Sequence, residues 1–303
     1  MINLSQLIPD ALDRGASDIH LTVGKPPIFR LNGALVEQGD RPLTENDTFN
    51  AAAQLATAAQ FEDFRKVGEA DFATTFQNMV RMRCNVFFQR GNTALALRLL
   101  PLRIPTVEEL RLPDVVVAQA DKPRGLVLVT GPTGSGKSST LAALIDHINQ
   151  KSHRHIITLE EPIEYLHTSK ECIINQREVG ADTGSFAAGL RAALRQDPDV
   201  ILVGEMRDLE TISTAITAAE TGHLVFGTLH TKGAANTIDR VIDSFPAEQQ
   251  NQIRIQLADV LECAVGQTLL PRIQGGRVAA FEIMVMTPAI RSMILQSKTF
   301  QIT

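Results

Sequence analysis

One segment of the sequence has glycines, a lysine and a serine in the order that phosphate binding requires. Residues 131–138 read Gly-Pro-Thr-Gly-Ser-Gly-Lys-Ser and fit the pattern G-x-x-x-x-G-K-[ST]. In such a loop backbone amides face phosphate oxygens, Lys137 reaches the β and γ phosphates, and Ser138 coordinates Mg²⁺. The residues expected to bind the nucleotide are Gly131, Pro132, Thr133, Gly134, Ser135, Gly136, Lys137, Ser138 and Ser139. The segment therefore predicts binding of ATP with Mg²⁺ and, for a P-loop protein, ATP hydrolysis.

A second segment delivers a carboxylate at the end of an apolar run. Residues 200–205 read Val-Ile-Leu-Val-Gly-Glu. In open parallel sheets ligands bind beyond the carboxyl ends of the strands, so Glu205 is expected near the nucleotide. We interpret Glu205 as the Walker B residue that holds Mg²⁺ or its water shell. The alternative is a solvated glutamate at a strand end.

A third segment places several carboxylates after another apolar run. Residues 158–164 read Thr-Leu-Glu-Glu-Pro-Ile-Glu. Phosphoryl transfer to water needs a group that orients the attacking water, and a glutamate at a strand end can do this. Spacing alone does not choose among Glu160, Glu161 and Glu164, and an exposed acidic turn is the alternative.

A fourth segment, residues 221–231, contains His223 and His230 around the apolar run Leu-Val-Phe-Gly-Thr-Leu. A neutral histidine at the end of a strand can hydrogen-bond the γ-phosphate or a neighbouring side chain. A lone histidine is as often structural, so both roles stay open.

The elements that position these segments form an α/β pattern. From Gly125 onward, helical segments alternate with short apolar runs at residues 126–129, 156–159, 200–203 and 224–227. Buried parallel strands have this composition because helices cover both faces of the sheet. After the phosphate-binding segment, apolar residues between 141 and 148 recur at helical spacing, as the motif requires.

The preceding part of the chain has a different pattern. Apolar spacing predicts a helix over residues 3–14, and Asn32-Gly33 predicts a hairpin within the alternating residues 19–36. Residues 47–66 are compatible with a helix. Three antiparallel strands are predicted at residues 70–76, 80–88 and 94–100. Four prolines between residues 101 and 123 indicate the connection, so we expect a small α+β domain over 1–100, a linker over 101–123 and an α/β domain over 124–303.

The bulk properties restrict the class of protein. The 303-residue chain has a net charge of −5, which gives no general attraction to nucleic acid. No run of about 18 apolar residues predicts a membrane-spanning helix, and residues 1–9 do not resemble a secretion signal. The three cysteines form no CxxC pair, so no zinc site is expected. The composition predicts a cytoplasmic protein.

Taken together, the four segments resemble the Walker A motif, Asp box, Walker B motif and His box of the secretion ATPase superfamily, which drives type II secretion and type IV pili. The similarity covers nearly the whole chain and looks greatest to the pilus retraction ATPases. The further segments that carry it are GASDIHL at 15–21, RAALRQDPD at 191–199, EMRDLET at 205–211, residues 219–231, and AIRSMI at 289–294. The last is similar to the AIRNLI motif of retraction motors, from which it departs at Ser292 and Met293.

The resemblance implies a PAS-like α+β amino-terminal domain, a RecA-like ATPase domain and a hexameric ring with ATP between protomers. It implies that Glu164 is the general base, with Glu161 standing where the family usually has Asp. It gives Glu205 the Walker B role and His230 the His-box role, with His223 beside it.

Members of the family also bring arginines of the amino-terminal sheet to the nucleotide. The residues that match are Arg81, Arg83 and Arg98. The alternative is that these are exposed strand arginines.

The resemblance further implies a motor that couples ATP hydrolysis to pilus retraction, and hence to pilus disassembly and twitching motility. Its expected partner is an inner-membrane pilus platform protein, and its expected location is the cytoplasmic side of the inner membrane at the pilus base. The sequence contains no tetracysteine zinc element and no larger amino-terminal region, which favours retraction over extension. Retraction ATPases usually continue with a further helical region, so a chain ending at Thr303 is expected to be shortened at its carboxyl end.

Two other functions stay open. The first is an accessory, weakly active paralogue that assists another retraction ATPase, which complementation of a retraction-deficient strain would distinguish. The second is a RecA-like nucleic-acid translocase, whose ATPase would be stimulated by single-stranded DNA. The acidic balance, the aromatic content of 5% and the absence of Trp argue against the second.

Overall fold

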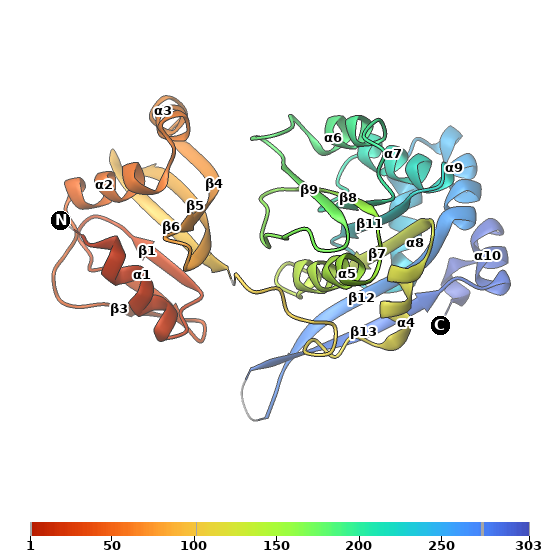
Figure 1. Cartoon of the computed structure of the whole chain (residues 1–303), viewed down its shortest axis with the longest axis horizontal. Coiled ribbons are helices and arrows are strands. Elements are labelled where there is room, and N and C mark those ends of the chain that lie inside the picture. Colours follow the sequence, from red (N-terminus) through yellow and green to blue (C-terminus); the bar gives the residue numbers. More distant parts are fainter. Residues whose placement is uncertain (1, 101, 274–275, 303) are drawn as a thin grey trace. The chain divides into compact units, whose positions relative to one another are not determined.

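The computed structural model of the chain describes residues 2–100, 102–273 and 276–302 (Figure 1). It divides into two compact units, Met1–Arg103 and Ile104–Thr303. The first contains an antiparallel sheet, and the second a mostly parallel sheet. Each unit is described by itself below.

The first unit is built on a sheet with strand order β3-β2-β1-β6-β5-β4. Its elements are α1 (Leu4–Asp13), β1 (Asp18–Leu21), β2 (Ile28–Leu31), β3 (Ala34–Glu37), α2 (Glu45–Leu55), α3 (Ala58–Val67), β4 (Glu69–Phe76), β5 (Val80–Gln89) and β6 (Asn92–Leu100). The predicted first helix, the Asn32-Gly33 hairpin and the three later strands are confirmed. Residues 47–66, which are compatible with a helix, belong to two helices, because the chain breaks at Ala56 and Thr57.

Alternating residues give the two faces of this sheet different chemistry. On β5, Val80 and Met82 belong to the core formed with the three helices. Arg81 and Arg83 alternate with them in sequence and so face the other way, because successive side chains on a strand point to opposite faces. Arg98 on β6 is the direct register partner of Arg83. The three predicted arginines therefore share the face of the sheet opposite the helices.

The second unit is built on a sheet with strand order β13-β12-β7-β11-β10-β8-β9. Its strands are β7 (Gly125–Thr130), β8 (His155–Glu160), β9 (Ile173–Glu178), β10 (Val200–Val203), β11 (Leu224–Leu229), β12 (Leu261–Pro271) and β13 (Arg277–Val285). Its helices are α4 (Asp114–Val117), η1 (Ala118–Asp121), α5 (Lys137–Lys151), α6 (Phe186–Ala193), α7 (Leu209–Glu220), α8 (Ala234–Asp243), α9 (Ala247–Val260), α10 (Pro288–Leu295) and η2 (Thr299–Gln301). Every paired strand is parallel to its neighbours except β13, which is antiparallel to β12.

Helices cover both faces of this sheet, and the core alternates accordingly (Figure 1). On β7, Leu126 and Leu128 pack in the cluster that includes α6 to α9. Val127 and Val129 pack in the other cluster, with α5. This two-sided burial explains the continuous apolar runs in the sequence. It also holds β7, β11, β10 and β8 side by side, so that their carboxyl ends meet at one edge.

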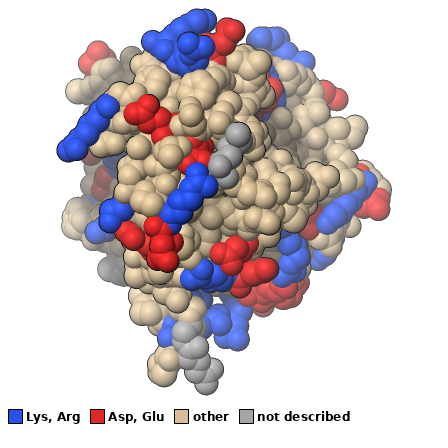
Figure 2. Space-filling model, turned by 90° about the vertical axis from the view of Figure 1, so that its left-hand side faces the viewer, with Lys and Arg blue, Asp and Glu red and all other residues tan. Residues whose placement is uncertain are grey.

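The face of the molecule shown in Figure 2 carries charged side chains of both signs. Within the part of the chain that the structure describes, no helix has the length and apolar character needed to cross a membrane. Figure 2 shows basic and acidic side chains interspersed over one face of the molecule.

Candidate nucleotide-binding site

The phosphate-binding loop connects β7 to α5 and is closely packed. Gly136 precedes the helix with a φ of +91°, and no side chain caps the first turn. The amide groups at this helix end therefore remain available to an anion, which the helix dipole also favours. A Cβ at Gly131 would lie 2.2 Å from the carbonyl oxygen of Gln267, and a Cβ at Gly136 would lie 2.8 Å from Gln267 Nε2. Only glycine fits at either position.

Lys137 lies over this loop. Its Nζ donates hydrogen bonds to the carbonyl oxygens of Gly131 (2.8 Å) and Pro132 (3.1 Å). Burial lowers the pKa of Lys137, while the negative charges of Glu205 and Glu164 act in the opposite direction. Both predicted carboxylates are thus close enough to interact with the lysine that would contact phosphate.

Glu205 follows β10 and is held by the side chains of Arg207 and His230. Its Oε1 lies 3.1 Å from His230 Nε2 and also pairs with Arg207. Partial burial acts to raise the pKa of Glu205, but the hydrogen bonds and charges of Arg207 and His230 outweigh it, and the net pKa is lowered. Glu205 therefore presents an ionised carboxylate at the edge where the phosphate-binding loop lies, as a magnesium ligand requires.

The three glutamates after β8 have different surroundings. Glu160 Oε1 accepts hydrogen bonds from Thr158 Oγ1 (2.7 Å) and Gln176 Nε2 (3.1 Å), and burial raises its pKa. Glu161 is exposed and lies 3.7 Å from Arg207. Glu164 is half-buried and acts on the pKa of Lys137. Of these three glutamates, Glu164 is the one whose charge acts on the pKa of Lys137.

A tyrosine that the sequence reading did not single out links this loop to α5. Tyr165 is 8% exposed, and its hydroxyl lies 2.8 Å from Ser139 Oγ. Gln176 Nε2 donates to the backbone oxygen of Tyr165 at 2.8 Å. Glu164 is thereby anchored, through its neighbour in sequence, to the helix turn that carries Ser138.

Gln267 of β12 was also missed, although it touches the phosphate-binding loop at several points. It is 4% exposed, its Nε2 donates to the Ser135 carbonyl oxygen (2.9 Å), and its Oε1 accepts from Thr140 Oγ1 (2.9 Å). The available signal was a polar side chain in the apolar stretch 261–270. Such a residue is buried only when its hydrogen bonds are satisfied.

Comparison with known proteins agrees with this geometry. A profile of the family described as Type II/IV secretion system protein matches residues 1–302. The chain belongs to the type II/IV secretion ATPase family. This secretion ATPase is 49% identical over 300 residues to the type IV pilus retraction ATPase PilT of Pseudomonas aeruginosa, covering 99% of this chain and 87% of the relative. It is 44% identical to the uncharacterized protein YggR of Escherichia coli, covering 99% of this chain and 91% of that protein.

A solved structure gives the same result for the fold. The crystal structure of the pilus retraction motor PilT with bound ADP matches the whole chain with a TM-score of 0.94 and 50% identity, and the match covers 88% of that structure. The predicted architecture, an amino-terminal domain followed by a RecA-like ATPase domain, is confirmed. The predicted ATPase class is confirmed as well.

The prediction that His223 lies at the nucleotide site beside His230 is not supported within one chain of the secretion ATPase. His223 precedes β11 and His230 follows it, so the two histidines lie at opposite ends of that strand. They are seven residues apart along the strand, about 23 Å at roughly 3.3 Å per residue. His223 Nδ1 is instead 2.9 Å from the Ala218 carbonyl oxygen, a contact that joins α7 to the strand.

The three predicted arginines lie in the first unit, where Arg98 pairs with an acidic residue. Arg98 Nε donates to Asp18 Oδ1 at 3.1 Å, and Asp18 also lies 3.7 Å from Arg30. Arg81 is 8% exposed and Arg83 is partly exposed. Their contact with nucleotide stays a prediction.

A pocket of about 200 Å³ adjoins the phosphate-binding loop of the secretion ATPase. It is lined on one side by Gly136, Ser139 and Thr140. The rest of its lining is mixed: Leu110, Leu112 and Leu269 are apolar, Arg272 and Arg277 are basic, and Glu109 and Gln267 also contribute. A partly apolar cavity with a few polar groups next to a phosphate site has the character of a nucleoside pocket.

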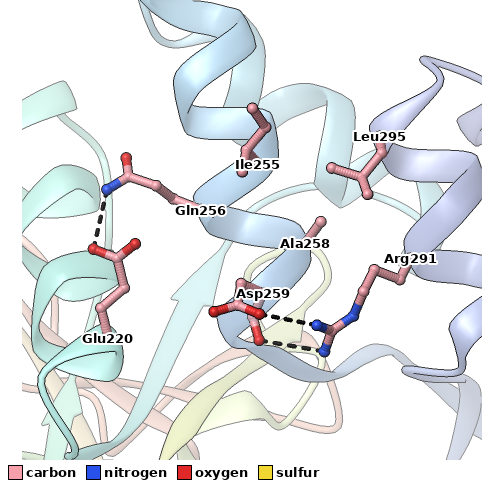
Figure 3. A pocket seen from close by; sticks show the side chains of 7 residues that line it. All are labelled: Glu220, Ile255, Gln256, Ala258, Asp259, Arg291 and Leu295. Atoms are coloured by element: carbon pink, nitrogen blue, oxygen red, sulfur yellow. Dashed lines mark hydrogen bonds and ion pairs between the residues drawn. The ribbon is translucent and has the colours of Figure 1, made fainter.

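A second pocket lies by the segment that resembles the retraction motif (Figure 3). Arg291 of α10 points to Asp259 of α9, with Nη1 2.9 Å from Oδ1. Gln256 Nε2 donates to Glu220 at the end of α7, at 3.0 Å. Arg291 therefore ties α10 to α9, which is a structural role inside the second unit.

Proposed function

We propose that this secretion ATPase is a hexameric motor that couples hydrolysis of ATP to the retraction of type IV pili, and hence to twitching motility. The observation that carries the proposal is the convergence of the loop 131–138, Glu164, Glu205 and His230 around Lys137 at one edge of the sheet. The 49% identity to a pilus retraction ATPase over 99% of the chain supports the pilus as the object on which the motor acts.

In this proposal each group at the site has one role. The loop amides and Lys137 bind the β and γ phosphates, and the pocket beside Gly136 and Thr140 accepts the nucleoside. Glu164 orients the attacking water and accepts its proton. His230 holds the Glu205 carboxylate in place.

The same residues fit Mg²⁺. Ser138 stands in the first turn of α5, and the ionised Glu205 reaches the same edge of the sheet, so these two would hold the cation or its water shell. Bound Mg²⁺ would neutralise phosphate charge. No described group of three or more His, Cys, Asp or Glu side chains forms a separate metal cluster.

We further propose domains over residues 1–100 and 124–303, with the linker 101–123 as the hinge between them. In the ring, Arg81, Arg83 and Arg98 of the amino-terminal domain would approach nucleotide. The motor would act on an inner-membrane pilus platform protein from the cytoplasmic side, peripherally bound at the pilus base. The action of the motor on this partner would depend on the nucleotide state, because the γ-phosphate of ATP would order contacts around the site.

An accessory role beside a paralogous retraction ATPase is the second candidate. The departures at Ser292 and Met293 from the retraction motif favour it. Complementation separates the two: a main motor restores twitching to a strain without its retraction ATPase, whereas an accessory paralogue restores it only when another retraction ATPase is present.

The direct test is ATP binding and turnover by the purified oligomer. We expect calorimetry with Mg²⁺ to detect ATP binding by the wild type and Lys137→Ala to lose turnover, because the lysine reaches the phosphates. Lys151→Ala, which removes an exposed lysine at the other end of α5, is the control and should behave as the wild type. A wild-type oligomer that binds no ATP would exclude the proposal.

A further inference from the structure

The phosphate-binding loop is held from the side by a strand that enters the sheet about 130 residues later. β12 pairs in parallel with β7, and the pairing runs to Gly266 opposite Thr130, at the base of the loop. The next residue of β12 is Gln267. The sheet therefore fixes the position of Gln267 in space, next to the start of the phosphate-binding loop.

Gln267 makes three kinds of contact with the loop and its helix. The amide Nε2 donates to the Ser135 carbonyl oxygen at 2.9 Å, and the amide Oε1 accepts from Thr140 Oγ1 at 2.9 Å. Its backbone oxygen approaches Gly131 so closely that no Cβ fits there. One side chain therefore connects the second half of the loop to the first turn of α5.

Burial makes these bonds hard to replace with water. Gln267 is 4% exposed and Thr140 is 1% exposed. A buried donor or acceptor that loses its partner retains the full cost of leaving water, so each bond constrains the geometry strongly. The Ser135 carbonyl, fixed in this way, sets the orientation of the peptide that joins it to Gly136.

We propose that Gln267 is a positioning residue for nucleotide binding, which acts by fixing the loop amides and the first turn of α5 in the conformation that receives phosphate. This proposal rests on the proposed ATP site. Gln267 also lines the pocket that we assign to the nucleoside, and the role proposed here is that of its hydrogen bonds to the loop and α5. The amide group matters because a single side chain must donate to Ser135 and accept from Thr140.

The test is Gln267→Leu, which keeps the apolar stem and removes both hydrogen bonds. We expect its Kd for ATP with Mg²⁺ to rise by about 10-fold or more, in line with the loss of one to two buried hydrogen bonds. Thr140→Val should weaken binding by a smaller factor, and Thr140→Ser, which keeps the hydroxyl, should restore it. Gln267 and Thr140 act through one shared contact, so their effects should not multiply. The Kd of the double variant should lie below the value expected from the product of the two single effects, and close to the Kd of Gln267→Leu alone.

Thr268→Val serves as the control, since Thr268 is the exposed neighbour on the same strand and should leave the Kd unchanged. Thermal unfolding of each variant separates a folding defect from a binding defect: a purely structural role would lower the melting temperature and leave the Kd of the folded fraction at the wild-type value, and Thr140→Ser would then show no selective rescue. That outcome, with wild-type binding intact, would overturn the inference and leave the proposed function standing. Absence of ATP binding by the wild type would instead remove the proposed function.

Discussion

At the scale of single residues, two carboxyl groups that lie near each other in sequence have different surroundings in the site. Glu160 is enclosed by Thr158 and Gln176, and burial raises its pKa. Glu164 is half-buried and interacts electrostatically with both Glu160 and Lys137. A carboxyl with satisfied hydrogen bonds inside the protein suits a structural role, whereas one whose charge acts on the phosphate-binding lysine suits proton transfer. The two roles follow from the surroundings and not from the residue type.

The first prediction concerns Glu164. Glu164→Gln should bind ATP with nearly wild-type affinity and lose turnover by roughly 100-fold or more, because an amide cannot accept the proton of the attacking water. Steady-state phosphate release and calorimetry measure the two effects. Glu171→Gln, which alters an exposed glutamate on the segment before β9, should turn over normally. Wild-type turnover in Glu164→Gln would remove Glu164 from the role of base.

The second prediction concerns pH. The pKa of Glu205 is lowered because Arg207 and His230 outweigh the effect of its partial burial. The Glu205 carboxyl is therefore ionised from mildly acidic pH upward. It becomes protonated only as the pH falls below the range in which a glutamate ordinarily titrates. His230→Ala removes one of the two stabilising groups, so the acid limb of the pH profile of kcat/KM should move to higher pH. An unchanged acid limb would show that His230 does not act on Glu205.

Sequence reasoning located some of these residues and missed others for a physical reason. Lys137 and Glu205 were found because each lies in a local motif at a strand end. Gln267 and Tyr165 were missed because their partners, Thr140 and Ser139, are far away in sequence and are brought close only by strand order. His223 and His230 were assigned to one site because a motif written as one segment spans both ends of β11.

At the scale of elements, helix ends show how local chemistry overrides composition. The Ala-rich stretch 47–66 is compatible with helix throughout, yet Thr57 and Gln60 form a capping box that begins α3 as a separate helix. Thr44 and Asp47 form the same device at the start of α2. Both boxes are readable as T-x-x-Q and T-x-x-D, so this boundary was available in the sequence. The pairing of β12 with β7 was not, since it joins segments about 130 residues apart.

The third prediction concerns the cap of α2. Asp47 is 2% exposed and accepts hydrogen bonds from the backbone amides of Thr44 (3.0 Å) and Ile2 (2.8 Å). The hydrogen bonds from Thr44 outweigh the effect of burial, which acts to raise the pKa, and the pKa of Asp47 is lowered from 3.8 to about 2. The stabilisation is thus complete above pH 4 and is lost as the pH falls toward 2. Asp47→Ala should destabilise α2 by roughly 1 kcal/mol at neutral pH.

Hydrogen exchange of peptides covering residues 45–55 measures this effect without requiring the two units to unfold together. Exchange in Asp47→Ala should be faster than in the wild type at pH 7, and the two proteins should converge in acid. Asp40→Ala, at an exposed position, is the control. Equal protection of α2 in Asp47→Ala at pH 7 would contradict the assigned role.

At the scale of the whole molecule, the nucleotide-binding residues and the predicted arginines lie in different units. Lys137, Glu164 and Glu205 belong to Ile104–Thr303, whereas Arg81, Arg83 and Arg98 belong to Met1–Arg103. The three arginines share one sheet face that the helices of their own unit leave uncovered. In a ring of identical chains, a head-to-tail interface can bring this face to the nucleotide of a neighbour.

The last prediction tests whether that contact is made between protomers. Lys137→Ala has no working phosphate-binding loop, and Arg98→Ala lacks one arginine of the sheet face, so each alone should turn over slowly. Asp18 keeps Arg30 as a partner in Arg98→Ala, which should preserve the fold. If the arginine acts across the interface, rings mixed in equal amounts contain sites with an intact loop next to an intact Arg98. Random mixing makes these about a quarter of all sites, so turnover should rise to about that share of the wild-type rate.

Arg65→Ala, which removes an exposed arginine of α3, should be active without mixing. A mixture no more active than the mean of its two components would place Arg98 either in the same chain's site or outside the reaction, because neither arrangement creates a complete site on mixing.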